Sequence, residues 1–456
     1  MTQKPVFDYD IIVIGSGAGG APAASILARA GKRVAIVERD AFGGESPNHG
    51  DMPLGALLHA AHTYRNTKTA ATFGLRAAST GYNYPSLMAW RDTVIKRTGA
   101  GGNRSYYEKQ GISVFAGNAH FLSPNELSVG RRRLSARKFL IATGSNWMAP
   151  AIPGLSDVSH LTPATMSHLT RPPKSLFIVG SGTTAMELAH LFSSLGTKVL
   201  ISEQAAHILP AFDSEVSDAF AQDAKTRGIT LLPGSQVTAV QKEGLQKRIS
   251  YLHGRQQRSV KVDELIIADQ RLPETDLGLE NAGVTYTDAG ITVSAFMQTS
   301  ARHIFAVGSC IDTMLQTHAI LTQSRAAAHN LLHRSFIEAD TAPDLHVAFT
   351  APELAQTGLN EAACLDKGIH HTSSVAPLIL TARSNITDHR TGFVKLIADS
   401  KGVIIGATVV APHASDIITQ LSLAIRYRLT AQQLITTPNC FTAWTEAIRI
   451  AAGKLL

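Results

Sequence analysis

The hydrophobic pattern of the first forty residues predicts a strand, a helix and a second strand in close succession. Residues 11–14 are all apolar, residues 21–30 are mostly small or apolar, and residues 33–37 form a second short strand that is apolar after Arg33. The segment 15–20, between the first strand and the helix, contains four glycines. A strand that runs directly into a glycine-rich turn and a helix is typical of a doubly wound α/β sheet.

The glycines of this turn have the spacing of a dinucleotide-binding loop. Gly15 permits the tight turn, Gly17 lets a pyrophosphate approach the backbone, and Gly20 allows the helix to pack closely on the strand. The helix N-terminus then faces the phosphates, and Glu38, at the end of the second strand, accepts hydrogen bonds from a ribose. The segment therefore predicts a first dinucleotide cradle.

The same pattern recurs about 165 residues later and predicts a second cradle. Its strand, loop, helix and closing strand fall at residues 175–179, 180–185, 186–195 and 198–202. Gly180 and Gly182 take the first two glycine positions, and Ala185 is a permitted variant at the third. Glu203 ends the closing strand, and an acid there favours a free ribose 2′-hydroxyl, hence NADH over NADPH, although NADPH stays open.

The remaining segments fit around these two cradles. Helices are expected at 54–65 and 86–108, and a β-rich piece follows them. After residue 340 the chain shows alternating strands at 392–397 and 403–410, with helices starting at Asp416 and Thr442. This last region has no nucleotide signature and predicts a separate α+β domain.

Composition excludes several classes of protein. With 456 residues, 44% hydrophobic and 17% charged, the chain is neither disordered nor fibrous. The net charge of +7 is a mild excess, and the densest basic cluster, residues 131–133, is interpreted as a solvated hairpin, so no nucleic-acid partner is expected. No apolar stretch approaches the roughly 20 residues of a membrane helix, so no membrane span is expected.

Cysteine is scarce, and this predicts a reducing, cytoplasmic location. The three cysteines, Cys310, Cys364 and Cys440, are widely spaced, which rules out a disulfide framework and shows no metal-ligand spacing. No metal site is therefore predicted.

Motifs along nearly the whole chain resemble the flavin-dependent pyridine nucleotide–disulfide oxidoreductases, a group that includes dihydrolipoamide dehydrogenase and mercuric reductase. The motifs are the two glycine turns with their terminal acids, 142–144, 271–273, 297–300, 304–308, 349–353 and 392–395. The resemblance implies an α/β fold with two doubly wound Rossmann-like dinucleotide-binding domains and a C-terminal α+β dimerisation domain. It also implies FAD in the first cradle, NADH or NADPH in the second, and a homodimer.

The resemblance assigns a role to each region and to individual residues. An FAD-binding domain is expected in two parts, 1–150 and 273–340, with an NAD(P)-binding domain at 151–272 and the dimerisation domain at 341–456. The FAD contacts it implies are Gly15, Gly17, Gly20, Glu38, Gly44, Ala119, Thr143, Gly144, Ser309 and Leu315. The nicotinamide nucleotide contacts it implies are Gly180, Gly182, Glu187 and Glu203.

The chain departs from this family where the family's redox disulfide lies. The family reads Gly-Gly-Thr-Cys, four residues, then Cys, whereas here Ser46 and Asp51 occupy the two cysteine positions. Neither side chain forms a disulfide or a thiolate, and no other cysteine pair lies nearby in sequence. The chain is therefore not expected to be a standard disulfide reductase.

Other family residues of the active site are also replaced. The lysine beside the flavin becomes Gly55, which leaves Glu187 without that cation, and the general acid–base histidine becomes Phe441, although its carboxylate partner survives as Glu446. The aspartate that grips the FAD ribityl chain becomes Ser309, so a charge-assisted hydrogen bond is lost. Thiol-directed acid–base chemistry is thus absent from both halves of the site.

For each of three remaining site residues, two interpretations stay open. By resemblance Asp51 faces the flavin, where it either relays a proton to a substrate or merely caps a loop. His49 is interpreted as structural, with proton transfer as the alternative, and Cys440 as a buried apolar residue, with a redox role as the alternative.

We expect an FAD-dependent NAD(P)H oxidoreductase that passes electrons from flavin directly to an acceptor, with Asp51, Ser46, Glu187 and Glu446 as candidate catalytic residues. A quinone, a metal ion, dioxygen, a second nicotinamide or a redox protein would each qualify as acceptor. The alternative is a catalytically silent relative that binds flavin or nucleotide as a sensor or scaffold. A third hypothesis is thiol chemistry through Cys440.

Overall fold

A computed structural model describes residues 6–76, 80–98, 103–312 and 316–456. By its internal contacts the chain divides into two compact units, and each contains segments that are far apart in sequence. The first unit comprises residues 1–56, 88–148 and 270–341, and the second comprises residues 57–87, 149–269 and 342–456.

The first unit is built on a mostly parallel sheet in the order β3-β2-β1-β6, with β18 also paired to β6. These strands are β1 (Tyr9–Ile14), β2 (Val34–Glu38), β3 (Ser113–Ala116), β6 (Arg132–Ile141) and β18 (Ile304–Ala306). Their apolar side chains are almost wholly buried because helices or other segments cover both faces of a parallel sheet. The predicted strand–helix–strand unit at the N-terminus is confirmed.

One long strand, β6, joins two kinds of pairing in this unit. Its first residues pair antiparallel with β5 (Glu126–Val129), which in turn pairs with β4 (Ala119–Ser123). Val129 lies opposite Arg132, so residues 130 and 131 form a tight turn and the basic cluster lies on a hairpin, as predicted. Short strands β7 (Ser145–Trp147) and β15 (Arg271–Pro273) form a separate antiparallel ribbon.

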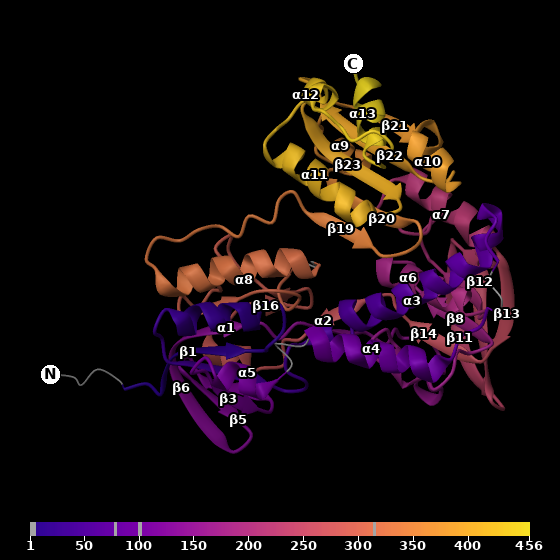
Figure 1. The fold of residues 1–456 in the computed structure, drawn as a ribbon. Coiled ribbons are helices and arrows are strands. Elements are labelled where there is room, and N and C mark those ends of the chain that lie inside the picture. The colour runs from indigo at the N-terminus through magenta and orange to yellow at the C-terminus, as the bar shows by residue number, and fades with distance from the viewer. Residues whose placement is uncertain (1–5, 77–79, 99–102, 313–315) are drawn as a thin grey trace. The chain divides into compact units, whose positions relative to one another are not determined.

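Helices α1 (Gly20–Arg29) and α8 (Thr317–Leu332) lie side by side in the first unit (Figure 1). Their contact is fixed by Ser324, whose hydroxyl donates to the Gly19 carbonyl at 2.6 Å. The buried serine thus satisfies a backbone group at the start of α1.

The helices between the two cradles differ from the sequence prediction. The structure has α2 (Glu45–Asn48), α3 (Asp51–Thr69), α4 (Tyr84–Thr98) and α5 (Arg104–Glu108). Most of the helical stretch expected at 54–65 and 86–108 is helical, but Asn103, directly before α5, is extended, and residues 99–102 lie outside the described residues.

The second unit contains a parallel sheet in the order β10-β9-β8-β14. Its strands and helices are β8 (Ser175–Val179), α6 (Thr183–Ser194), β9 (Lys198–Ser202), α7 (Ser214–Arg227), β10 (Thr230–Leu232) and β14 (Glu264–Ile267). An antiparallel sheet that the sequence reading did not identify follows, formed by β11 (Ser235–Glu243), β12 (Gln246–His253) and β13 (Gln256–Val262). The predicted second cradle is confirmed as a doubly wound unit.

The C-terminal part of the second unit is an antiparallel sheet in the order β19-β20-β23-β22-β21. Its strands are β19 (Leu345–Ala348), β20 (Glu353–Gly358), β21 (His371–Pro377), β22 (Phe393–Asp399) and β23 (Ile404–Ala411). Its helices are α9 (Glu361–Asp366), α10 (Ala382–Thr387), α11 (Ala414–Arg426), α12 (Ala431–Thr436) and α13 (Glu446–Gly453).

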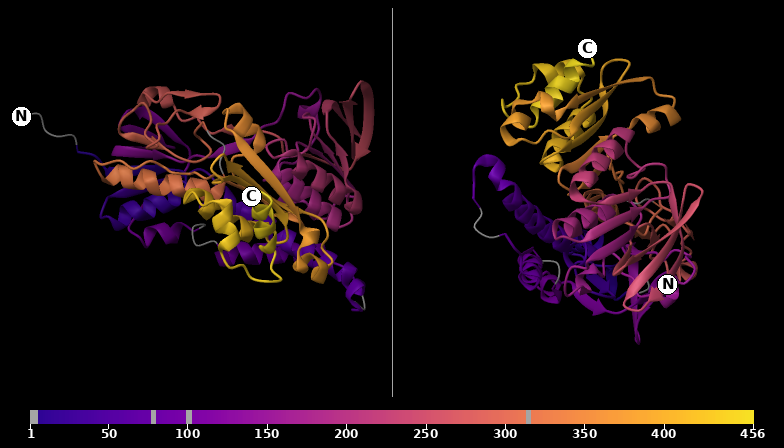
Figure 2. Two further views of the ribbon diagram at one scale, coloured as in Figure 1. Left: turned by 90° about the horizontal axis from the view of Figure 1, so that it is seen from above. Right: turned by 90° about the vertical axis from the view of Figure 1, so that its right-hand side faces the viewer.

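Helices α11 and α13 pack on this sheet, coloured yellow and light orange in Figure 2. Val394, Leu396 and Ala398 alternate along β22 and join the buried cluster beneath these helices. The predicted α+β domain is confirmed, although α11 starts two residues before the expected Asp416 and α13 four residues after the expected Thr442.

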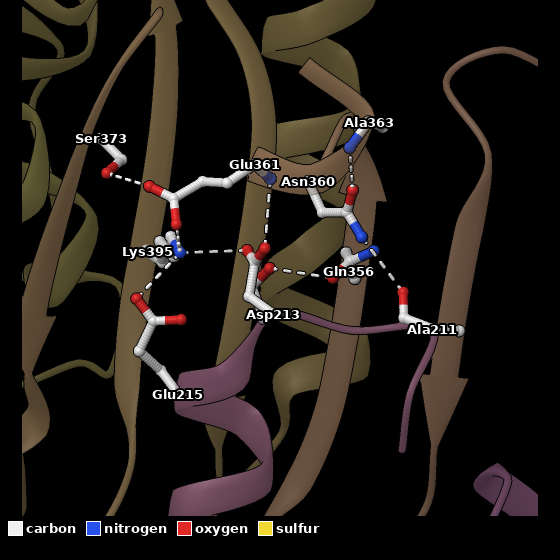
Figure 3. A network of polar contacts seen from close by, with 10 residues as sticks. Ala211, Asp213, Glu215, Gln356, Asn360, Glu361, Ala363, Ser373 and Lys395 are labelled. Carbon is white, nitrogen blue, oxygen red and sulfur yellow. Dashed lines mark hydrogen bonds and ion pairs between the residues drawn. The ribbon is translucent and has the colours of Figure 1, made fainter. Parts of the chain in front are cut away.

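The opposite face of β22 carries a fully buried lysine that joins the two parts of the second unit (Figure 3). The Lys395 ammonium lies 3.2 Å from Asp213, 2.9 Å from Glu215 and 2.8 Å from Glu361. Burial alone would lower the pKa of Lys395, but hydrogen bonds to Glu215 and Glu361 raise it above its ordinary value. The ends of α7 and α9 are thus fixed over the sheet by one cation.

Candidate functional site

The two cradles hold their acidic residues in the same way. Ser16 Oγ donates to Glu38 Oε2 at 2.6 Å, and Ser181 Oγ donates to Glu203 Oε2 at 2.6 Å. The backbone amide two residues after each acid donates to its Oε1, at 2.9 and 2.8 Å. Both carboxylates are therefore fixed at the carboxyl end of a strand, where a ribose of a bound dinucleotide lies in this fold.

Close backbone approaches require a glycine at several positions in and beside the two loops. A Cβ on Gly20 would lie 1.9 Å from the Gly15 carbonyl oxygen, and a Cβ on Gly180 would lie 2.5 Å from that of Ala268. Gly44 approaches Gly17 equally closely, since its Cβ would lie 2.5 Å from the Gly17 Cα. A side chain at any of these three glycines would therefore force the backbone out of its position.

The helix that follows each loop begins without a capping side chain. The N-caps of α1 and α6 are Gly19 and Gly182, which have no side chain to cap the first turn. Backbone amides at such an end bind anions such as a pyrophosphate, and the macrodipole adds to the attraction. The residues present therefore fit FAD in the first cradle and a nicotinamide nucleotide in the second.

The second cradle contains a cavity of about 160 Å³. Its lining includes Val179, Gly180, Ser202 and the two carboxylic acids Glu203 and Asp269. Burial, and then the charge of Glu203, raises the pKa of Asp269 above its ordinary value. The sequence analysis missed Asp269, which is adjacent to the glycine loop only because β14 pairs with β8.

In the first unit the two replaced cysteine positions contact each other through a hydrogen bond. Ser46 Oγ, in α2, donates to Asp51 Oδ2 at 2.9 Å, and Thr317 Oγ1, from the first turn of α8, donates to the same oxygen at 2.7 Å. Asp51 is the first residue of α3, so it lies in a helical turn rather than in a loop. Its side chain is exposed. Thr317 was missed because it is 266 residues away in sequence.

The segment that carries Ser46 is anchored by an ion pair that the sequence did not indicate. Both terminal nitrogens of Arg271 contact the Glu45 carboxylate, the Nη1–Oε1 bond being 2.8 Å. The same guanidinium stacks over Trp147, with its carbon 4.8 Å from the ring centroid. Because Glu45 directly precedes Ser46, this bidentate ion pair limits the movement of the segment that carries Ser46.

Glu187 lies in the second unit, where its carboxylate contacts the backbone of the C-terminal part. Its Oε1 accepts a hydrogen bond from the Phe349 amide at 2.7 Å, and the side chain is buried. One helical turn later, His190 accepts from the Ala351 amide at Nδ1, at 3.2 Å. Helix α6 therefore holds the 349–351 segment through two side chains.

The C-terminal candidates lie near the start of α13. Glu446 Oε2 accepts from the Ala382 amide at 3.2 Å, so this carboxylate connects α13 with α10. Phe441 is 77% exposed, and Cys440 is exposed as well, which corrects the expectation that Cys440 is buried. Both lie on the surface of the single chain because they precede α13 in an irregular segment.

The other predicted FAD contacts lie near the first cradle, with one exception. Thr143 Oγ1 donates to the Glu274 carbonyl, Gly144 follows it with a positive φ, and Ser309 comes directly after the turn at Gly308. Ala119 is buried in β4 opposite Val129. Leu315 lies outside the described residues.

Cys310 is fully buried, and burial raises the pKa of its thiol, so it packs as a small apolar residue. Among the described residues there is no group of three or more histidines, cysteines and acids that would hold a metal ion. Nor does any described helix have the length and apolar character needed to cross a membrane.

Comparison with known proteins identifies the family. The model of the pyridine nucleotide-disulphide oxidoreductases matches residues 9–329, and the model of their dimerisation domain matches residues 345–452. The chain belongs to the pyridine nucleotide-disulphide oxidoreductase family. The resemblance inferred from the sequence is thereby confirmed, and the dimerisation domain implies a homodimer.

The relatives include enzymes of two activities. The chain is 29% identical to mercuric reductase of Bacillus cereus over 450 residues, which is 98% of this chain and 71% of that protein. It is 32% identical to dihydrolipoyl dehydrogenase of Thermus scotoductus over 453 residues, which is 98% of this chain and 97% of that protein. These homologues are NAD(P)H-dependent flavoprotein oxidoreductases, and the family binds FAD and NAD(P)H.

Solved structures share the fold at lower identity. LpdA from Mycobacterium tuberculosis aligns with a TM-score of 0.87 at 24% identity, covering 98% of this chain and 99% of that chain. The flavoprotein disulfide reductase RclA from Escherichia coli aligns with a TM-score of 0.86 at 23% identity, covering 98% of this chain and 99% of that chain. Unlike a disulfide reductase with a redox-active cysteine pair, this chain has serine and aspartate at the two cysteine positions.

Proposed function

We propose that this protein is an FAD-dependent NAD(P)H oxidoreductase that passes electrons from flavin directly to an acceptor, without a redox-active disulfide. The observation that carries the proposal is the hydrogen bond between Ser46 and Asp51 at the two cysteine positions, in a chain whose two nucleotide cradles are both complete. Neither side chain stores electrons, so the acceptor must take them from the flavin itself.

The cradles support the electron-donating half of this reaction. We propose that residues 1–150 and 273–340 bind FAD, with Glu38 on its ribose, and that residues 151–272 bind the nicotinamide nucleotide, with Glu203 on its ribose. When bound, FAD would supply the redox chemistry, accepting a hydride and passing its two electrons on. A fixed carboxylate at each strand end and an uncapped helix at each loop orient the two ligands.

Asp51 is the proposed proton-transfer residue for the acceptor. Its Oδ2 accepts hydrogen bonds from Ser46 and Thr317, which hold the carboxylate in one orientation. The side chain is exposed, so an acceptor from solvent reaches it. Quinones, metal ions, dioxygen, a second nicotinamide and redox proteins are the acceptor classes that need no thiol, and proton transfer applies to those that are protonated on reduction.

The proposed assembly is a homodimer that acts on a small-molecule or protein acceptor. Large apolar side chains are exposed on the C-terminal part of the single chain, namely Leu380, Leu423, Tyr427 and Phe441. Burial against a second copy would remove these side chains from water. Because the chain has only three cysteines, we propose the cytoplasm as its location.

A catalytically silent relative is the second candidate function. It is favoured by the loss of the acid–base histidine, where Phe441 stands, and by the engagement of Glu187 with the Phe349 amide. Two complete cradles argue against it because a pure scaffold does not need both. Thiol chemistry through Cys440 is a third candidate, favoured by the exposure of that residue.

An anaerobic titration of the purified protein with NADH, then NADPH, tests the proposal. We expect flavin absorbance to bleach completely at about one equivalent of nucleotide per flavin, since flavin takes up two electrons. A protein that binds flavin but is bleached by neither nucleotide, or that binds no flavin, would be the silent relative. Acceptor reduction that disappears in Cys440→Ser, with flavin still bound, would instead identify thiol chemistry.

A further inference from the structure

The two cradles share one frame, but the residue that follows the strand beside each glycine loop differs in charge between them. In each cradle, the alanine that directly follows the strand beside the glycine loop lies against the first glycine: Ala142 against Gly15, and Ala268 against Gly180. The next residue is Thr143 in the first cradle and Asp269 in the second. The serine, the strand-end acid and the first two loop glycines match between the cradles, so the change from threonine to aspartate lies on a shared frame.

The position of Asp269 puts its charge in the nucleotide cavity. The Cβ of an alanine at Gly180 would lie 2.7 Å from the Asp269 Cα, so the acid lies directly behind the loop that would hold the phosphates. Asp269 lines the same cavity as Glu203. The counterpart Thr143 is neutral, and its hydroxyl donates to the Glu274 carbonyl instead.

We propose that Asp269 is a specificity-determining residue of the second cradle, which together with Glu203 disfavours a nucleotide with a 2′-phosphate. This inference rests on the proposed function, because it assumes that the cavity binds a nicotinamide nucleotide. It names the unphosphorylated dinucleotide, NADH, as the one that the site is built to take.

Charge is the physical reason for this discrimination. A 2′-phosphate adds a charge of about −1.5 to −2 at neutral pH, and two carboxylates lining one cavity repel it together. Glu203 is held by hydrogen bonds to Ser181 and to a backbone amide, so it stays close to the ribose position. The raised pKa of Asp269 agrees with this arrangement, because burial and the charge of Glu203 are its causes.

Binding measurements on single-charge variants test the inference without catalysis. We would measure the affinities for NAD⁺ and NADP⁺ by calorimetry, for the wild type, Asp269→Asn and Asp269→Thr, the last reproducing the residue of the first cradle. Asp218→Asn is the matched control, since it removes the same charge from an exposed position on α7. Low and high ionic strength would be compared, because salt screens the repulsion.

We expect both Asp269 variants to bind NADP⁺ about tenfold more tightly than the wild type at low salt, with NAD⁺ affinity changed by less than about threefold. The wild-type preference for NAD⁺ should shrink at high salt, and Asp218→Asn should behave as the wild type. An unchanged NAD⁺ to NADP⁺ ratio in both Asp269 variants overturns this inference alone. If the wild type and all variants bind neither nucleotide, the proposed function fails as well.

Discussion

At the scale of single residues, the Ser46–Asp51 contact replaces a covalent redox centre with a polar one. A hydroxyl hydrogen-bonded to a carboxylate carries a proton, whereas a disulfide takes up two electrons when it is reduced to two thiols. Asp51 also accepts from Thr317, so the carboxylate is fixed by donors on two different helices. This arrangement suits a residue that transfers a proton to an acceptor while the electrons come from elsewhere.

Asp51→Asn is therefore expected to slow only reactions in which the acceptor takes up a proton. Reoxidation of the reduced flavoprotein by a quinone should fall by about 10²-fold, a typical loss for general acid catalysis. Reduction by NADH should stay within about twofold of the wild type. Stopped-flow absorbance of the flavin measures both steps.

Ferricyanide provides the matched acceptor, because it takes electrons without protons, and its reduction should be unaffected in Asp51→Asn. Ser46→Ala, which keeps the carboxylate and removes one hydroxyl, should have a smaller effect than Asp51→Asn. Equal slowing with quinone and ferricyanide would show that Asp51 only supports the local structure.

At the scale of elements, one buried cation holds α7 and α9 on β22. Lys395 is fully buried and contacts Asp213, Glu215 and Glu361. Burial raises the pKa of Glu361, but hydrogen bonds from Lys395 and Ser373 lower it below its ordinary value overall. Since three acids lie around one cation, the stability of the folded second unit depends on that cation.

Replacing Lys395 by methionine should destabilise the second unit by about 3–5 kcal/mol, since it leaves the acids without their cation. Thermal unfolding of the dimer at neutral pH would show the loss as a lowered transition temperature. Lys401→Met, which removes an exposed lysine from the turn after the same strand, is the control and should change little. If the transition temperatures of Lys395→Met and Lys401→Met were equal, this account would be contradicted.

One buried histidine, His190, and one half-buried histidine, His62, both in the second unit, predict sensitivity to acid. Burial, and then Arg227, lowers the pKa of His62 to about 4 and that of His190 well below its ordinary value. The folded state therefore keeps both neutral, whereas the unfolded chain binds protons near pH 6.5. The free energy of unfolding should fall as pH drops below about 6.5, by about 1.4 kcal/mol per pH unit for each histidine.

His62→Gln should flatten this dependence between about pH 6.5 and pH 4, because it removes one of the groups that must stay neutral. Its Nε2 is buried with no hydrogen-bond partner among the described residues, so little else is lost. Melting temperatures across this range give the slope. His59→Gln, on the exposed side of the same helix, should retain the wild-type slope; parallel slopes in both variants would refute the role of His62.

The elements that sequence patterns predicted are those with a continuous buried face. Strands β1 and β8 are apolar along most of their length, and each was predicted with its cradle. Strand β13 has side chains that are exposed at nearly every position, so no alternation marks it. It forms because it continues a hairpin from β12 through the turn at Gly254, which a hydrophobic pattern does not reveal.

At the scale of the whole molecule, local spacing predicted the cradles, and sequence resemblance predicted the family. The Ser16–Glu38 and Ser181–Glu203 contacts each span 22 residues within one βαβ unit, and the motif itself implied a role for both acids. Thr317 reaches Asp51 across 266 residues, and Phe349 reaches Glu187 across 162. Such contacts depend on how whole segments pack, so spacing along the chain did not indicate them.

Electron capacity is the property of the whole molecule by which we expect it to differ from the disulfide reductases of its family. Ser46 Oγ and Asp51 Oδ2 are only 2.9 Å apart, so side chains at these positions reach each other. We expect Ser46→Cys/Asp51→Cys, once oxidised, to take up about four electrons per flavin in an anaerobic NADH titration, against two for the wild type. Ser46→Cys alone, which has no partner thiol, should take up two. A double variant with a confirmed disulfide that still takes up only two electrons would show that the Ser46–Asp51 site does not exchange electrons with the flavin, and that the acceptor must be sought elsewhere on the protein.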